Sequence, residues 1–325
     1  MPQASRILVA DIGGTNTRVA LTRGGALDPG SVRRFANRDF AGLGAILGRY
    51  LAALGHPRCD GACIAAAGLV ADGVAQMTNL DWTITPDDLR AATGASRVAI
   101  INDLQAQGHA LDRLATAVLR PVIVPEAAAE GAGPDAVRLV IGAGTGFNAA
   151  VVHPLGGRRL VTASECGHAS LPVASREDFD LACHLRERTG FASVEEALAG
   201  RGLVTLYNWH AARLGAKALA DGAAIMAALA AGAPAAVAAG RHYVRLFGQV
   251  AGDHALIHLP RGGLYLIGGM ARAFAPHFAA FGFADAFRDK GRFGHFLEAF
   301  AVHVVEDDDA ALTGCAAHMA AELGR

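Results

Sequence analysis

The chain has 325 residues, which suggests about two domains of ordinary size. Hydrophobic residues make up 52% and charged residues 18% of it, and 29 Lys and Arg stand against 30 Asp and Glu for a formal net charge of −1. This balance excludes a disordered chain and gives no general basic surface, so we expect no nucleic acid partner.

Short apolar runs predict strands along the whole chain, at 7–10, 19–21, 63–67, 98–101, 139–141, 149–152 and 264–267. Helical spacing of apolar residues predicts a helix over 40–54. Thr85 followed by Pro86 predicts a second helix start, and Pro234 opens a long alanine-rich helix. Strands that alternate with helices are typical of an α/β chain with mixed sheets.

No run of residues is apolar enough for a membrane span, and the sequence reaches the strand at 7–10 without a secretory signal. We therefore expect a cytoplasmic protein with no membrane partner. The five cysteines are scattered and form no CxxC pair, which argues against a disulfide scaffold and a four-cysteine zinc site.

One pattern occurs twice. An apolar strand, a glycine turn with a threonine and a second apolar strand span 7–21, and the same order returns at 139–151. This repeat indicates two related halves. A third glycine turn, Gly268-Gly269, follows the strand at 264–267 and can either approach a nucleoside or simply connect a strand to a helix.

Glycine turns let the backbone approach a ligand closely, and their N–H groups can face phosphate oxygens. Gly13, Gly14 and Thr15 form the first such turn, while Gly142, Gly144, Thr145 and Gly146 form the second. Either turn alone is more often just a tight turn. Asp11 precedes the first turn and suits Mg²⁺, held directly or through water, although it can also merely cap the turn. The common P-loop and dinucleotide-binding motifs are absent from the sequence.

Three further segments carry polar residues with two interpretations each. Asn102 and Asp103 end an apolar strand, where they fit a helix N-cap or a proton acceptor with a hydroxyl-binding amide. Glu165 and His168 flank Gly167 and can bind one sugar, or lie in a plain surface loop. Ser193 and Glu196 fit a capping box and Glu195 suits the positive end of a helix, so on local grounds a helix cap is favoured over a ligand role for Glu195.

Taken together, these motifs resemble the bacterial ATP-dependent glucokinases outside the repressor–kinase group. The resemblance covers nearly the whole chain and rests on 11–18, 77–79 with Trp82, 101–103, 142–146, 165–168, 200–207, 267–270 and 289–293. It implies an actin-like fold of two ribonuclease-H-like α/β domains with mixed sheets, and substrates bound in the cleft between them. The implied domains are residues 1–113 with 307–325, and residues 114–306.

The resemblance also implies roles for single residues. Asp103 is the catalytic base, and the glucose ligands are Asn102, Asp103, Glu165, His168 and Glu195, so Glu195 moves from cap to ligand. The implied ATP-binding residues are Ala10, Asp11, Ile12, Gly13, Gly14, Thr15, Gly142, Gly144, Thr145, Gly146, Gly268 and Gly269. Asp11 would hold Mg²⁺ through water, and the protein would form a homodimer.

The sequence departs from the family in one place, because Cys166 stands where the usual pattern has glycine, which bears on sugar selectivity. The zinc-binding cysteines of the repressor–kinase group are missing, and no helix-turn-helix module precedes Ile7, so we expect neither structural zinc nor DNA binding.

The expected reaction is transfer of the γ-phosphoryl group of Mg·ATP to the 6-hydroxyl of D-glucose, which gives glucose 6-phosphate and ADP as the first step of glucose catabolism. Three alternatives remain at this point. The acceptor can be another hexose, such as mannose or an amino sugar. The protein can be a sugar-binding regulator without turnover, or an actin-like ATPase that uses no sugar.

Overall fold

A computed structural model describes residues 6–77, 80–127 and 129–324. Thr78 and Asn79 of the motif at 77–79 lie outside the described residues. The chain divides into two compact units, and each is described by itself. The first comprises Met1–Ala115, Gly156–Ala163 and Asp307–Arg325, and the second comprises Thr116–Leu155 and Ser164–Glu306. The predicted domains place residues 156–163 in the other group, and the domain assignment stays a prediction.

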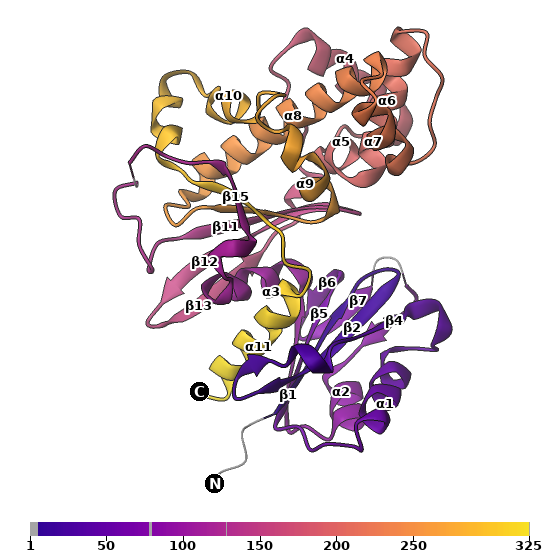
Figure 1. Cartoon of the computed structure of the whole chain (residues 1–325), viewed down its shortest axis with the longest axis vertical. Coiled ribbons are helices and arrows are strands. Elements are labelled where there is room, and N and C mark those ends of the chain that lie inside the picture. Colours follow the sequence, from indigo (N-terminus) through magenta and orange to yellow (C-terminus); the bar gives the residue numbers. More distant parts are fainter. Residues whose placement is uncertain (1–5, 78–79, 128, 325) are drawn as a thin grey trace. The chain divides into compact units, whose positions relative to one another are not determined.

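The first unit is built on a mixed sheet (Figure 1). The strands of this unit are β1 (Ile7–Ile12), β2 (Asn16–Arg23), β3 (Ala26–Leu27), β4 (Arg33–Ala36), β5 (Gly61–Ala66), β6 (Gly68–Ala71), β7 (Val74–Met77), β8 (Thr83–Ile84), β9 (Arg97–Asn102) and β13 (Arg158–Ala163), of which β6, β7 and β8 form a separate small sheet. Its helices are α1 (Leu43–Ala53), α2 (Pro86–Thr93), α3 (Asp103–Ala110) and α11 (Ala310–Glu322).

The main sheet of this unit has the order β3-β2-β1-β5-β9, and β4 also pairs with β2. β1 and β2 form an antiparallel hairpin, whereas β5 and β9 run parallel to β1. The register aligns Ile12 with Ala66 and Ala66 with Asn102, so the carboxyl ends of three parallel strands share one edge. Residues that follow these strands are thereby brought together.

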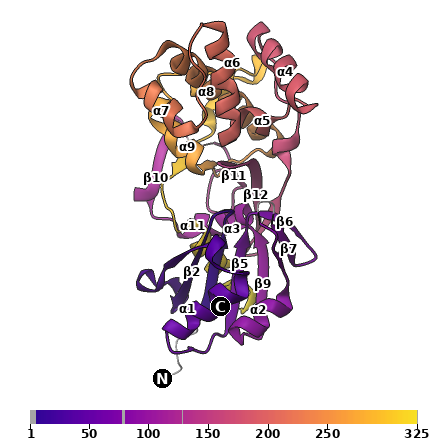
Figure 2. The ribbon, with the colours of Figure 1, turned by 90° about the vertical axis from the view of Figure 1, so that its right-hand side faces the viewer.

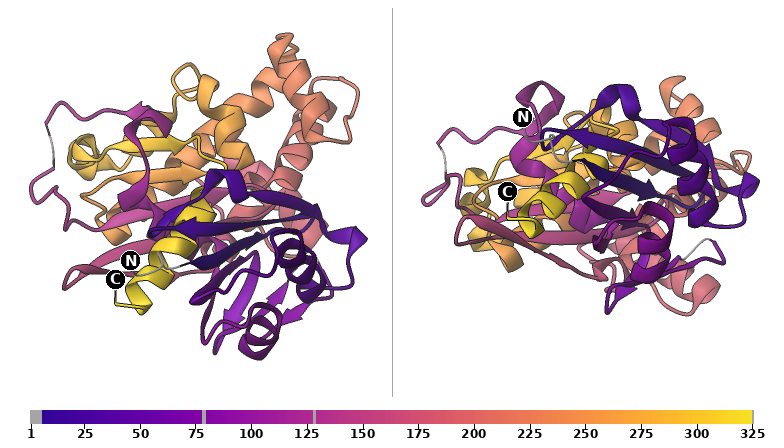
Figure 3. Two further views of the ribbon diagram at one scale, coloured as in Figure 1. Left: turned by 60° about the horizontal axis from the view of Figure 1, so that its bottom comes forward. Right: turned by 90° about the horizontal axis from the view of Figure 1, so that it is seen from below.

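Successive side chains of β1 point to opposite faces of the sheet, and both faces are covered by hydrophobic residues. Leu8 and Ile12 pack in the hydrophobic cluster beneath α1 and α2, while Ile7 and Val9 pack in the cluster formed with α11. Figure 3 shows α11, in yellow, lying along the indigo strands β1 and β2. The C-terminal helix therefore completes the core of the N-terminal sheet.

The second unit has a helical layer over its own sheet, as Figure 2 shows for α5 to α9 above β11 and β12. Its strands are β10 (Leu119–Ile123), β11 (Arg138–Ala143), β12 (Phe147–Leu155), β14 (Leu264–Ile267) and β15 (Val302–Val305). Its helices are α4 (Arg176–Thr189), α5 (Val194–Leu198), α6 (Gly200–Arg213), α7 (Gly222–Ala230), α8 (Pro234–His258), α9 (Gly269–Phe274) and α10 (Phe283–Arg288).

The strand order here is β10-β15-β14-β11-β12. β11 and β12 form an antiparallel hairpin, and β14 and β15 lie parallel to β11. A hairpin beside two parallel strands is also the arrangement of the first unit. The two related halves predicted from the repeated glycine pattern are therefore confirmed, as is the α/β class with mixed sheets.

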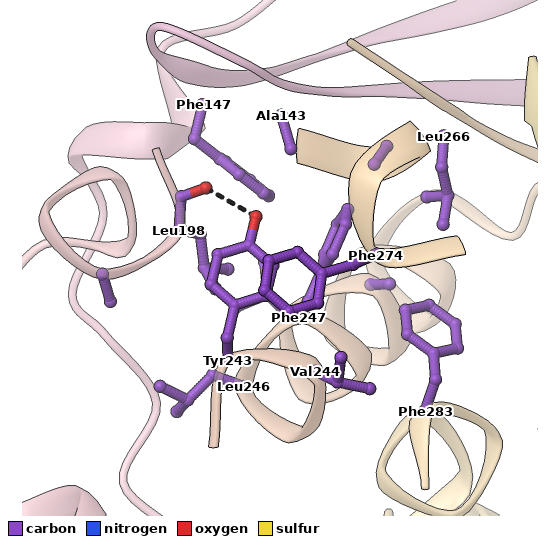
Figure 4. Packing of buried hydrophobic residues seen from close by; sticks show 14 of the residues in the cluster. Ala143, Phe147, Leu198, Tyr243, Val244, Leu246, Phe247, Leu266, Phe274 and Phe283 are labelled. Atoms are coloured by element: carbon purple, nitrogen blue, oxygen red, sulfur yellow. Dashed lines mark hydrogen bonds between the residues drawn. The ribbon is translucent and has the colours of Figure 1, made fainter. Parts of the chain in front are cut away.

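An aromatic cluster around α8 fills the core of the second unit (Figure 4). Tyr243 stacks on Phe274 with ring centroids 4.3 Å apart, and its hydroxyl donates to the Leu198 carbonyl oxygen at 2.9 Å. Phe147, the first residue of β12, packs edge-on against Phe247 of α8 with centroids 5.8 Å apart. The glycine hairpin before Phe147 is thus anchored directly to the core.

Each predicted strand coincides with an observed one, and the helix starts are also confirmed. Thr85 and Asp88 form a reciprocal capping box at the start of α2, and Pro234 is the first residue of α8. The helix predicted over 40–54 is α1. In the described part of the chain no single helix is long and apolar enough to span a membrane, and α7 with α8 passes that test only as a pair bent by 108°.

Gly314 lets α11 lie directly against α3, because a Cβ atom there would be 1.7 Å from the Ala106 carbonyl oxygen. Gly314→Ala should therefore lower the free energy of unfolding by about 2 kcal/mol or more through overpacking. Urea unfolding followed by circular dichroism measures this.

The matched control is Gly48→Ala on α1, where the added Cβ meets no atom within 4 Å. This change should stabilise the protein by about 0.5–1 kcal/mol, since alanine favours a helix over glycine. A Gly314→Ala protein as stable as the wild type would show that α11 and α3 are not tightly packed.

Candidate functional site

The first glycine hairpin, Gly13–Thr15, connects β1 to β2 and is braced by Asn37. The Gly13 N–H donates to the Asn16 carbonyl oxygen at 3.0 Å. Asn37 is buried, its Nδ2 donates to the Gly13 carbonyl oxygen at 2.8 Å, and its backbone N–H donates to the Thr15 carbonyl oxygen at 2.9 Å. The hairpin backbone is therefore held from behind while the Thr15 side chain stays exposed.

Asp11 forms an ion pair with Arg18 across the β1–β2 hairpin. Arg18 Nη2 donates to Asp11 Oδ2 at 2.6 Å, because the antiparallel register places the two residues opposite each other. Arg18 also lies 3.8 Å from Asp309 of the segment before α11. Asp11 is thus a positioned carboxylate with its second oxygen left for other ligands, an arrangement that we did not predict.

Asn102 caps α3, as one of its two predicted roles requires. Its Oδ1 accepts the Leu104 N–H at 2.9 Å, and its Nδ2 donates to the Gly68 carbonyl oxygen at 3.2 Å. The Gln105 side chain in turn accepts the Asn102 N–H at 3.0 Å, which completes a capping box. The cap fixes the first turn of the helix that carries Asp103.

Asp103 is the first residue of α3. It directly follows β9, at the sheet edge where β1, which carries Asp11, also ends. Its Oδ1 accepts the Leu104 N–H at 3.0 Å. Burial, and next the negative charge of Asp11, raise the pKa of Asp103 to about 7. A carboxylate with this pKa is a much stronger base than an ordinary aspartate and still gains and loses a proton near neutral pH.

The second glycine hairpin joins β11 to β12 and contacts the two other glycine segments of its unit. The Gly144 N–H donates to the Gly146 carbonyl oxygen at 2.9 Å, and the Gly200 N–H at the start of α6 donates to the Gly144 carbonyl oxygen at 2.8 Å. A Cβ at Gly144 would lie 4.0 Å from the Gly269 nitrogen. Thr145 and Gly146 are exposed, as Thr15 is in the first hairpin.

Gly268 begins the turn from β14 to α9 and can only be glycine. Its φ is +96°, and a Cβ there would lie 2.3 Å from the Ala143 carbonyl oxygen. Since Gly142 pairs with Ile267 in parallel register, the turn at Gly268 emerges at the same sheet edge as the second hairpin. These backbone segments leave room for a ligand to approach closely.

Glu195 reaches back to the second hairpin. Its Oε2 accepts the Phe147 N–H at 2.9 Å, and its Oε1 accepts Arg201 Nη2 at 2.6 Å. Ser193, rather than Glu195, caps α5 by accepting the Glu196 N–H at 3.3 Å. The helix start predicted at Ser193 is therefore confirmed, with Glu195 in the first turn of α5.

Asn148 organises the loop that carries Glu165. Its Nδ2 donates to Glu165 Oε2 at 2.9 Å, and its Oδ1 accepts the Cys166 N–H at 3.1 Å. A Cβ at Gly167 would lie 1.9 Å from the Phe147 carbonyl oxygen, so this position requires glycine. Burial raises the pKa of the Cys166 thiol, while His168 in the following position of the loop is exposed.

The predicted residues thus form one group in each unit. Asp11, Asn102, Asp103 and the first hairpin share an edge of the first sheet, and Glu165, Glu195, the second hairpin and the turn at Gly268 gather in the second unit. Sequence reasoning missed the residues that hold them, which are Arg18, Asn37, Asn148 and Arg201. Arg18 alone had a local signal, because a hairpin that turns at 13–15 brings residues 11 and 18 together.

Solved structures that share this fold include sugar kinases. The crystal structure of glucokinase from an Antarctic psychrotroph has a TM-score of 0.84 and 30% sequence identity, covering 97% of this chain and 98% of that one. A ROK family glucokinase from Streptomyces griseus, solved in complex with glucose and AMPPNP, shares the fold with a TM-score of 0.65 and 23% identity over 98% of this chain and 100% of that one. The chain is an ATP-dependent hexose kinase with the actin-like ATPase fold.

Sequence comparison specifies the family. The family model described as Glucokinase matches residues 8–322. Glucokinase from Pseudomonas paraeruginosa is 37% identical over 312 residues, which is 94% of this chain and 90% of that protein. The chain belongs to the glucokinase family, and the resemblance drawn from its motifs is confirmed.

The raised pKa of Asp103 has a consequence for stability. An unfolded aspartate has a pKa of about 3.9, so between about pH 4 and pH 7 the folded protein binds more protons and its stability falls as pH rises. Asp103→Asn removes this dependence while keeping an oxygen that can accept the Leu104 N–H. The variant should therefore gain stability over the wild type as pH rises through this window, and the gain should level off above it.

Thermal unfolding of both proteins at a series of pH values measures the difference. Asp87→Asn on the exposed first turn of α2 is the control and should follow the wild type. A Tm difference between Asp103→Asn and wild type that does not change with pH would exclude a raised pKa at Asp103.

Proposed function

We propose that this protein transfers the γ-phosphoryl group of Mg·ATP to the 6-hydroxyl of D-glucose, giving glucose 6-phosphate and ADP. The observation that supports this most is Asp103, whose pKa of about 7 suits a general base and whose position is fixed by the Asn102 cap. Membership of the glucokinase family supports the same acceptor and donor.

In the proposed reaction Asp103 accepts the proton of the 6-hydroxyl as that oxygen attacks the γ-phosphorus. The bond from the γ-phosphorus to the bridging oxygen of ADP breaks, and ADP leaves with the electron pair. Because the transferred group needs little covalent help, the protein contributes mainly by positioning and by charge stabilisation. Asn102 can bind a neighbouring sugar hydroxyl with the Nδ2 hydrogen that Gly68 does not take.

The second unit supplies the remaining proposed sugar ligands. Glu165 accepts one hydrogen bond from Asn148, and Glu195 accepts one each from the Phe147 N–H and Arg201. A carboxylate has about four acceptor positions, so both side chains can still accept hydrogen bonds from sugar hydroxyls. His168 is exposed in the same loop and can donate or accept a further hydrogen bond. These side chains suit the hydroxyls at the reducing end of the sugar.

The two glycine hairpins are the proposed phosphate sites. Ala10 to Thr15 would contact the phosphates from the first unit, and Gly142, Gly144, Thr145 and Gly146 from the second. Both hairpins present an exposed threonine and backbone that a ligand can approach. The turn at Gly268-Gly269 would contact the nucleoside.

Asp11 fits a Mg²⁺ ion that arrives with ATP. Mg²⁺ prefers one or two carboxylates together with phosphate oxygens and water, and Arg18 binds only Oδ2 of the Asp11 carboxylate. When bound, Mg²⁺ neutralises charge on the phosphates. Asp11 would hold the ion, and Arg18 would keep the Asp11 side chain in place.

Three further points belong to this proposal. The protein would act in the cytoplasm at the first step of glucose catabolism, and it would be a homodimer. Cys166 is partly buried and its thiol stays protonated at neutral pH, so it would act on sugar choice through the shape of the Glu165 loop.

A panel of glucose, mannose and N-acetylglucosamine with ATP, ADP and polyphosphate tests acceptor and donor together, and glucose with ATP should give the highest kcat/KM.

Asp103→Asn should lower kcat with glucose by about 100-fold or more, because an amide cannot accept the proton. Glucose binding measured by calorimetry should weaken by no more than about tenfold, since Asn keeps a hydrogen-bonding side chain. Asp87→Asn is the control and should keep wild-type turnover. Near-normal turnover by a folded Asp103→Asn protein would remove Asp103 as the base.

Arg201→Gln should raise the KM for glucose by about tenfold, because Glu195 loses a charge-assisted hydrogen bond of about 1.5–3 kcal/mol. The KM for ATP should change little. Arg186→Gln, an exposed arginine on α4, is the matched control. An unchanged KM for glucose in Arg201→Gln would argue against Glu195 as a sugar ligand.

A further inference from the structure

Three helices of the second unit bring two histidines and a glutamate together away from the residues assigned above. Glu177 lies on α4, His210 on α6 and His242 on α8. One ligand atom of each lies within 4.8 Å of the others. His210 Nε2 is 3.1 Å from His242 Nδ1, and His242 Nδ1 is 3.9 Å from Glu177 Oε2.

These distances are close to those of a metal centre. Bonds of about 2.0–2.1 Å to a tetrahedral Zn²⁺ place neighbouring ligand atoms about 3.3 Å apart, so small side-chain shifts would suffice. His210 and His242 are buried, whereas the Glu177 side chain is 45% exposed. The cluster is therefore open to solvent on the glutamate side, which gives an ion a way in.

Asp178 orients one ligand as an outer-shell carboxylate does in metal sites. His242 Nε2 lies 2.9 Å from Asp178 Oδ1 inside the unit. With the Nε2 proton directed at Asp178, the lone pair of His242 Nδ1 faces His210 Nε2, with which it shares a hydrogen bond of 3.1 Å that a bound ion would replace.

The charges around the cluster also favour a cation. Glu177 and Asp178 supply two negative charges, and Arg245 supplies one positive charge 3.2 Å from Glu177 and 2.8 Å from Asp178. Glu177, Asp178 and Arg245 together carry one net negative charge, which a divalent cation would offset.

We propose that Glu177, His210 and His242 form a binding site for a divalent transition-metal ion of the Zn²⁺ type. Imidazole and carboxylate ligands suit Zn²⁺, Co²⁺ and Ni²⁺ more than Mg²⁺, and three protein ligands leave a position for water. A bound ion would link α4, α6 and α8. This site differs from the cysteine cluster whose absence led us to expect no structural zinc, and it does not depend on the proposed glucose phosphorylation.

Calorimetric titration of the full chain with Zn²⁺, after chelator treatment and without nucleotide, tests the site. The wild type should bind one Zn²⁺ with a Kd in the micromolar range or below. Glu177→Gln should weaken binding by about tenfold or more, because a neutral amide is a poor ligand. Glu177 is exposed, so this variant should fold normally, and His210→Gln should have an effect at least as large.

The control is His258→Gln on α8, which removes another imidazole that stacks on His254. It should keep the Kd within about twofold of wild type, as a change away from the site should. No Zn²⁺ binding by the wild type would overturn the proposal. Binding that His258→Gln abolishes and Glu177→Gln leaves intact would also overturn it, because the ion would then bind elsewhere.

Fluorescence of Trp209 provides a second measurement of ion binding that does not rely on calorimetry. Its ring centroid lies 4.8 Å from that of His210 and 5.9 Å from that of His242, and Trp82 is the chain's other tryptophan. In a Trp82→Phe background, Co²⁺ should quench Trp209 fluorescence and Zn²⁺ should reverse the quenching. Adding Glu177→Gln should shift the Co²⁺ midpoint about tenfold upward, and an unshifted midpoint would contradict the site.

Discussion

The burial of Asp103 next to the charge of Asp11 is the constraint on which the proposed chemistry depends. Burial disfavours the charged form of Asp103 and raises its pKa, and the negative charge of Asp11 near the same sheet edge adds to that cost. Arg18 forms an ion pair with Asp11 at 2.6 Å, so the two carboxylates have different surroundings. The proposed reaction uses this difference, with Asp11 as a charge near the phosphates and Asp103 as the base.

Sheet topology explains how each unit assembles its group of functional residues. A hairpin beside two parallel strands occurs in both units, as β2-β1-β5-β9 and as β12-β11-β14-β15. Because carboxyl ends of parallel strands meet at one edge, the hairpin turn and the residues after the neighbouring strands come together. Asp103 follows β9 in the first unit, and Gly268 follows β14 in the second.

Features set by neighbouring residues could be predicted from sequence. The apolar run at β1, the capping box at Thr85 and the cap at Asn102 all depend on residues within a few positions of each other. Glu195 shows the limit, because its carboxylate binds the Phe147 N–H, 48 residues away in the chain. The proposed metal site of Glu177, His210 and His242 shows it again, since its residues come from three helices that pack on one hydrophobic core.

The most direct measurement of the central claim is the pKa of Asp103 itself, followed by NMR of carbon-labelled aspartate side chains in the wild type and in Asp11→Asn. The account predicts a pKa of about 7 in the wild type and a lower value in the variant, where the neighbouring negative charge is gone. A pKa of about 4 in both proteins, which is the ordinary aspartate value, would contradict it.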